Sequence, residues 1–275
     1  MAEITAAAVN DLRKKTGLPM MDIKKALTDA NGNPEEAVRL LRERGLKVQS
    51  SRSDRVTEFG RFGIFASPTA GGIVELKCES APVTQNEEFI QLANDLAKQL
   101  AIGPGAATAD ELLDQPCPSK PGMTLRAVKD DMFNRIREVF NIGRMTRFAG
   151  SSAGYSHNSS TVSGVLLQVE GTNETAGKDI CMHIAAMRPV GLNKEDVPAA
   201  EVERERSILK ETALKEGKPA NIVDKVVDGQ LRNFFAERVL TEQSFVKDNK
   251  LTVGKYAEQS GLKLVKFILW ELGRE

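Results

Sequence analysis

The stretch ITAAAVNDLRKKTGLPMMDIKKALTDANGNPEEAVRLLRERG, residues 4–45, decides the N-terminal part of the fold. Thr5 and Asn33 are residue types that cap helix N-termini, because their side-chain oxygens accept bonds from free backbone N–H groups. Gly17 and Gly45 are typical helix ends, since a residue without a Cβ enters the left-handed conformation at little cost. Apolar residues recur between these signals at helical spacing. The stretch therefore predicts three short helices in one module, the third ending at Gly45.

The composition is that of a folded globular protein. The chain has 275 residues, of which 41% are hydrophobic and 28% are charged. Its 38 basic and 38 acidic residues cancel, so it lacks the net positive charge that drives binding to nucleic acid. Its 3 cysteines have no CxxC spacing, and the pattern predicts neither a signal peptide nor a membrane-spanning apolar run. We expect a cytoplasmic protein with no membrane segment and no direct nucleic-acid partner.

Beyond the module the apolar pattern changes to strands and longer helices. The order of two strands, a helix and a later strand occurs twice, which indicates an internal duplication. The first strand is predicted from Phe62 to Ser67. Helices are predicted from Thr124 to Phe140 and after Asn173 as N-cap, and a closing strand from Leu262 to Leu272. The prediction is an α+β fold with a duplicated core of antiparallel sheets and helices. Its divisions are a three-helix module at 1–48, a linker at 49–58, a core N-subdomain at 59–149, a core C-subdomain at 150–198 and 241–275, and a protruding antiparallel helical hairpin at 199–240.

Residue patterns of catalysis, metal binding and nucleotide binding are missing from the sequence. The chain has 2 histidines, His157 and His183, and neither has a second ligand at helical spacing. We therefore expect no catalytic residue, no metal and no cofactor. His183 lies at helical spacing with apolar neighbours, which favours the edge of an apolar face over a contact role. Met20 and Met21 are consecutive, so at least one must lean toward solvent or a partner.

Several segments resemble one known family along nearly the whole chain. LPMMDIKKAL at residues 18–27 is similar to the start of bacterial elongation factor Ts, the guanine-nucleotide exchange factor for elongation factor Tu. CMHIAAMRP at residues 181–189 and QSFV at residues 243–246 resemble two later family segments. NIGR at residues 141–144 and YSH at residues 155–157 are also family-like. The segments occur in the family's order.

The resemblance implies a fold, a partner and a mechanism without covalent chemistry. The three-helix module would be UBA-like and would dock on the nucleotide domain of elongation factor Tu. Binding would displace Mg²⁺ and loosen the phosphate site, so that GDP leaves and GTP can enter. The sequence leaves the oligomeric state open. The partner-binding residues implied by the resemblance are Arg13, Met20, Met21, His183, Ile184 and Ala185.

One loop departs from the family pattern. The Mg²⁺-displacing loop, usually Thr-Asp-Phe-Val, reads Ser80-Ala81-Pro82-Val83 here, so it offers neither a carboxylate nor an aromatic ring. The sequence leaves open whether Phe89 or Thr84 replaces the missing pair. The favoured interpretation is an exchange factor that ejects Mg²⁺ less directly than other members. The alternative is a chaperone-like partner of elongation factor Tu with weak or no exchange activity. A hydrolase, a transferase or a nucleic-acid binder is disfavoured.

Overall fold

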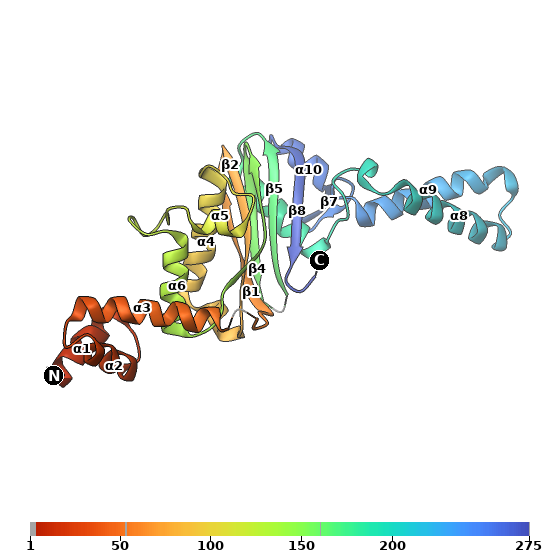
Figure 1. The fold of residues 1–275 in the computed structure, drawn as a ribbon. Helices are drawn as coiled ribbons and strands as arrows, with labels where there is room; N and C mark the ends of the chain where they lie inside the picture. The colour runs from red at the N-terminus through yellow and green to blue at the C-terminus, as the bar shows by residue number, and fades with distance from the viewer. Residues whose placement is uncertain (1–3, 53, 160, 275) are drawn as a thin grey trace. The chain divides into compact units, whose positions relative to one another are not determined.

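A computed structural model describes residues 4–52, 54–159 and 161–274 of the chain. Its elements are helices and small sheets, so the predicted α+β class is confirmed (Figure 1). The chain divides into two compact units, one made of Met1–Gly63 and Val74–Thr146 and the other of Ile64–Ile73 and Arg147–Glu275. Within the described residues, no helix combines the length and the apolar character needed to cross a membrane.

The first unit begins with the three predicted helices, α1 (Ala6–Thr16), α2 (Met20–Asp29) and α3 (Pro34–Ser50). The Thr5 hydroxyl accepts from the Ala8 N–H at 3.2 Å, and Asn33 Oδ1 accepts from the Glu35 N–H at 3.0 Å. Gly17 ends α1 in the left-handed conformation, with φ 69°. The predicted caps are therefore confirmed. The helices enclose a core of their own, formed by Val9, Leu12, Leu18, Ile23, Ala26, Leu27, Ala30, Ala37 and Leu41.

The predicted end of the third helix at Gly45 is wrong, because α3 continues to Ser50. A Cβ at Gly45 would lie 1.7 Å from Asn134 Oδ1, on a helix far along the chain. The missing side chain thus permits a close approach between two helices. Such a glycine is tolerated inside a helix at a cost of about 1 kcal/mol relative to alanine. The first part of the predicted linker therefore belongs to α3.

Further along the first unit lie the 3₁₀ turn η1 (Ala81–Gln85) and the helices α4 (Glu87–Ile102), α5 (Ala109–Leu113) and α6 (Leu125–Ile136). The helix predicted to reach Phe140 is shorter, because Arg137 takes a left-handed conformation and ends α6. The strands β1 (Phe59–Ala66), β2 (Ala70–Cys78) and β3 (Asn141–Ala149) form one sheet in the order β1-β2-β3. β1 begins three residues before the predicted Phe62.

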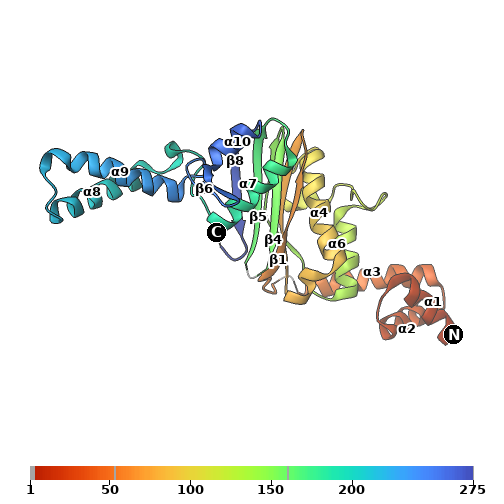
Figure 2. The ribbon, with the colours of Figure 1, turned by 180° about the vertical axis from the view of Figure 1, so that it is seen from behind.

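The second unit is built on an antiparallel sheet in the order β4 (Ser152–Asn158), β5 (Val162–Glu170) and β8 (Lys263–Glu271). Helix α7 (Glu174–Met187) packs on β4 and β5 (Figure 2). The predicted closing strand is confirmed by β8. Four short elements were not predicted: η2 (Lys194–Asp196), β6 (Ser244–Phe245), β7 (Asp248–Thr252) and α10 (Val253–Gln259).

The hairpin consists of α8 (Ala199–Lys215) and α9 (Ala220–Arg238), which pack along each other as predicted (Figure 1). Gly217, with φ 75°, lies in the turn between them. Their contact has a separate apolar core, because its residues do not join the cluster beneath the sheet. This core consists of Ala213, Val223, Val227 and Leu231.

Candidate partner-binding surface

The first turn of α2 presents an exposed apolar edge. Met20 is 43% exposed and Met21 is 76% exposed, whereas Ile23 behind them is fully buried. The prediction that at least one methionine faces solvent is therefore confirmed, and in fact both do. Arg13 is also exposed, in the last turn of α1. Methionine side chains are flexible and polarisable, which suits an adaptable contact. We call Met20 and Met21 the α2 edge.

The loop Ser80-Ala81-Pro82-Val83, which departs from the family pattern, is held in place by hydrogen bonds. The Ser80 N–H donates to Glu138 Oε2 at 3.0 Å, and the Ser80 hydroxyl donates to Glu138 Oε1 at 2.5 Å. The Thr84 hydroxyl donates to the Ala81 carbonyl at 2.7 Å. Val83 is buried, while Ala81 and Pro82 are exposed. The loop therefore offers a small, uncharged surface on a backbone anchored at both ends.

Charged groups beside the loop hold its first residues. Glu79 accepts from the Val139 N–H at 2.8 Å and from Arg55 at 2.9 Å. Burial pushes the pKa of Glu79 upward, but these two donors outweigh burial, so the pKa lies below its ordinary value. Burial, with a contribution from the charge of Glu138, raises the pKa of the Cys78 thiol to about 12. Cys78 is thus a neutral thiol, and it donates to the Ser80 carbonyl at 3.3 Å.

Neither residue considered as a replacement for the missing Asp-Phe pair projects from the loop. Phe89 is fully buried, with its ring centroid 5.7 Å from that of Phe140. The Thr84 hydroxyl is turned back onto the Ala81 carbonyl. Both side chains would have to leave their present contacts before they could reach a partner.

Sequence reasoning missed an exposed aromatic residue near the loop. Phe59 is 40% exposed and follows Val56, which is 72% exposed. Phe59 shares one face of β1 with Arg61, because side chains two residues apart in a strand point the same way. Arg61 donates from that face to the Thr84 carbonyl of η1 at 3.0 Å. Starting the strand pattern at Phe59 instead of Phe62 would have revealed this position.

His183, Ile184 and Ala185 on α7, which we call the α7 motif, lie further inside than the α2 edge. His183 is fully buried, its Nε2 lies 3.0 Å from Gln243 Oε1, and its Nδ1 accepts from the Val246 N–H at 3.3 Å. Gln243 also donates to the Glu237 carbonyl at 2.9 Å. Burial lowers the pKa of His183, although the bond to Gln243 works in the opposite direction. The neutral ring therefore connects α7 to the residues on either side of β6 and, through Gln243, to the end of α9.

The other α7 positions share this inward placement. Ile184 is fully buried and Ala185 is half-buried. Of the six residues expected to bind a partner, only Arg13 and the two methionines of the α2 edge are fully on the surface. Two residues hydrogen-bonded within this network have exposed apolar side chains, Met187, 46% exposed, and Val246, 48% exposed. A role of His183 in partner binding would accordingly be indirect.

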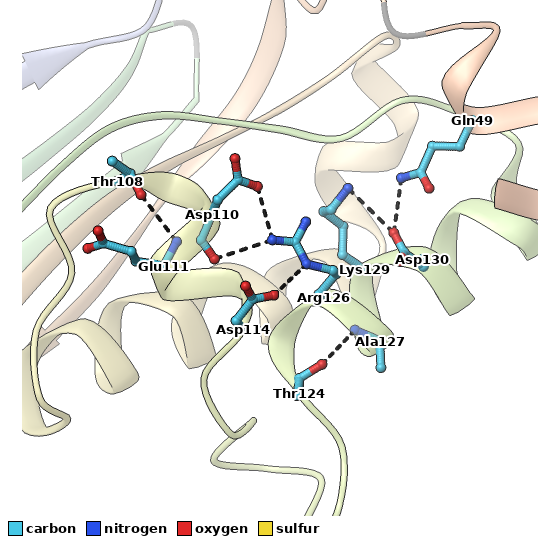
Figure 3. Close-up of polar contacts among 10 residues, drawn as sticks. All are labelled: Gln49, Thr108, Asp110, Glu111, Asp114, Thr124, Arg126, Ala127, Lys129 and Asp130. Atoms are coloured by element: carbon cyan, nitrogen blue, oxygen red, sulfur yellow. Dashed lines mark hydrogen bonds and ion pairs between the residues drawn. The ribbon is translucent and has the colours of Figure 1, made fainter. Parts of the chain in front are cut away.

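Helix α3 is held against α6 by polar contacts. Gln49 near the end of α3 donates to Asp130 on α6 at 3.0 Å, and Lys129 lies 3.6 Å from the same carboxylate (Figure 3). Burial lowers the pKa of Lys129, with Asp130 acting in the opposite direction. Arg126 in turn reaches Asp110 and Asp114 around α5 (Figure 3). The module that carries the α2 edge is thus joined to α6 through the end of α3.

The described residues contain no group of three or more His, Cys, Asp or Glu side chains placed to hold a metal ion. The exposed α2 edge and the anchored loop instead define an α+β protein with a surface suited to contact with another protein.

Comparison with known proteins gives the family. The family model described as "Elongation factor TS" matches residues 82–274. The chain is 40% identical over 276 residues to elongation factor Ts of Paraburkholderia xenovorans, an alignment that covers 99% of this chain and 92% of the relative. It is 38% identical over 275 residues to elongation factor Ts of Methylococcus capsulatus, covering 98% of this chain and 92% of that relative. The chain belongs to the elongation factor Ts family. The α2 edge lies outside the family-model match and within the near full-length similarity to the relatives.

Proposed function

We propose that this protein binds elongation factor Tu in its GDP form and promotes exchange of GDP for GTP in the cytoplasm. The observation that carries the proposal is the α2 edge, an exposed apolar pair on a module with its own core. In the elongation factor Ts family this segment is expected to dock on the nucleotide domain. Docking would move groups that hold Mg²⁺ and the phosphates. Mg²⁺ requires nearly octahedral coordination, so a small displacement of its ligands weakens GDP binding.

Exchange of this kind involves no covalent step by the factor. It is a coupling between two binding sites on the partner, so GDP must weaken binding of the factor as much as the factor weakens binding of GDP. The factor would use Met20, Met21 and Arg13 for direct contact. His183, Ile184 and Ala185 would support a second contact indirectly, by fixing the surface that carries Met187 and Val246.

The loop supports the alternative of a binding partner with weak exchange. Ala81 and Pro82 are exposed but provide neither a negative charge nor an aromatic ring. Phe59 offers an exposed ring on the β1 face that contacts η1. We propose that Phe59 supplies part of the apolar contact that the loop lacks.

Stopped-flow release of a fluorescent GDP analogue from elongation factor Tu tests these proposals. An exchange factor accelerates release, and its effect decreases as free Mg²⁺ is raised. Binding in a pull-down without accelerated release would select the chaperone-like alternative, and absence of both would overturn the proposed function. Ala81→Asp with Pro82→Phe should increase the release rate, and Phe59→Ala should lower it. No change with the loop variant would show that loop composition does not limit exchange.

A further inference from the structure

Helix α6 ends on a residue type that is unusual for its conformation. Arg137 has φ 66° and ψ 23°, the left-handed region, and its N–H donates to the Phe133 carbonyl at 2.7 Å. Glycine or asparagine commonly occupies this position after a helix, because a Cβ makes the conformation unfavourable. Strain kept at one position indicates that the side chain or the chain direction there has a use.

The side chain of Arg137 reaches the helix that carries the α2 edge. Arg137 donates to Asp22 Oδ2 at 2.5 Å, and Asp22 directly follows Met21. The carbonyl of Arg137 accepts from Arg52, just beyond α3, at 2.9 Å. Two separate segments of the N-terminal region are thus bound to one residue.

The next two residues hold the loop. Glu138 accepts both the N–H and the hydroxyl of Ser80, at 3.0 Å and 2.5 Å. The N–H of Val139 donates to Glu79 at 2.8 Å. Consecutive Cα atoms lie about 3.8 Å apart, so the anchor of α2 and the anchor of the loop are separated by one peptide unit. The left-handed turn at Arg137 redirects the chain between these two anchors.

We infer that Arg137 and Glu138 act as one positioning element that fixes the α2 edge and the Ala81–Pro82 loop relative to each other. A partner that docks on Met20 and Met21 would then receive the loop at a set distance. The consequence for exchange rests on the proposed function, whereas the fixed distance is a property of the free chain. These residues need not touch the partner, since they act through Asp22 and Ser80.

The distance can be measured directly on the full chain. Spin labels at two exposed positions, Lys25 on α2 and Gln85 after the loop, should give a narrow distance distribution. Arg137→Gly removes the bond to Asp22 and also relieves the left-handed conformation, so the protein should remain folded. We expect this variant to broaden the distribution, whereas Arg137→Lys, which keeps the positive charge, should leave it nearly as narrow as in the unmodified protein. An unchanged distribution in Arg137→Gly would overturn the inference.

The chain offers a matched control at the end of α7. Arg188 is also left-handed, with φ 50°, and it pairs with Glu271 at 2.7 Å. Arg188→Gly relieves the same backbone conformation far from the α2 edge in sequence, so it should leave the distribution between Lys25 and Gln85 unchanged. If both glycine variants broadened the distance distribution equally, the cause would be the change at a left-handed helix end in general, and a specific role of Arg137 would be contradicted.

GDP release then separates this inference from the proposed function. If the unmodified protein accelerates release, Arg137→Gly should lower the maximal rate about fivefold and change the half-saturating concentration less than twofold. A loss in affinity alone would assign Arg137 to docking and overturn its positioning role. If the unmodified protein does not accelerate release, the proposed function fails, and the label distances still decide the positioning.

Discussion

The α2 edge and the α7 motif came from the same kind of sequence similarity, yet they occupy opposite environments. Met21 is 76% exposed on the first turn of its helix, whereas His183 is fully buried and bonded on both ring nitrogens. Deleting a surface side chain removes a contact with a partner and leaves the core intact. Deleting a buried, hydrogen-bonded ring opens a cavity and leaves polar groups without partners. Substitutions in the α2 edge should therefore weaken binding, whereas substitutions in the α7 motif should first lower the stability of the fold.

The largest expected effect is on stability at α7. We expect His183→Ala to lower the free energy of unfolding by about 3 kcal/mol, because a buried ring and the bonds to Gln243 and Val246 are lost together. Denaturant unfolding followed by circular dichroism measures this change. His157→Ala is the control, since that ring is only partly buried, between Tyr155 and Ser159. A loss below about 1 kcal/mol would show that the surroundings of His183 adapt easily.

A smaller effect, on binding alone, is expected at the α2 edge. Met21→Ala should change the free energy of unfolding by less than about 0.5 kcal/mol, as is usual for surface positions. Its affinity for elongation factor Tu should fall about tenfold, which corresponds to about 1.4 kcal/mol. Isothermal titration calorimetry measures the affinity of the variant and of the control for elongation factor Tu. Ile102→Ala provides the control, because Ile102 is a 54% exposed apolar residue at the end of α4. Equal losses of affinity in Met21→Ala and Ile102→Ala would show that the α2 edge has no special role in binding.

Local signals in the sequence were sufficient for most elements. Thr5, Asn33 and Asn173 were predicted as N-caps, and each accepts from a backbone N–H of the helix that follows it. Such caps depend on neighbouring residues only, so one sequence contains all the information. The α2 edge could also be inferred locally, because two consecutive helical residues cannot both face one core.

Other features depend on residues far apart in the chain. Gly45 has the sequence appearance of a helix end, and only the position of Asn134 shows why the helix continues. Arg137 gives no local sign of a left-handed helix end, and its side-chain partner, Asp22, lies 115 residues earlier in the chain. The burial of His183 likewise requires Gln243. Long-range packing of this kind cannot be deduced from spacing in one sequence.

The smallest expected effect is the pH dependence that the buried ring gives to stability. Burial lowers the pKa of His183 below that of an unfolded histidine, about 6.5, so the native state favours the neutral ring. The unfolded chain therefore binds a proton first as the pH falls. The stability contributed by the neutral ring should be complete above about pH 6.5 and should decrease below it, by at most about 1.4 kcal/mol per pH unit.

The variant His183→Asn tests this pH dependence, because it keeps a polar side chain that does not titrate. The difference in unfolding free energy between the two proteins should thus be constant from pH 8 to about pH 7 and shrink toward pH 5. A difference that grows on acidification would mean that the ring is charged in the native state, and α7 would then resemble an exposed contact site like the α2 edge.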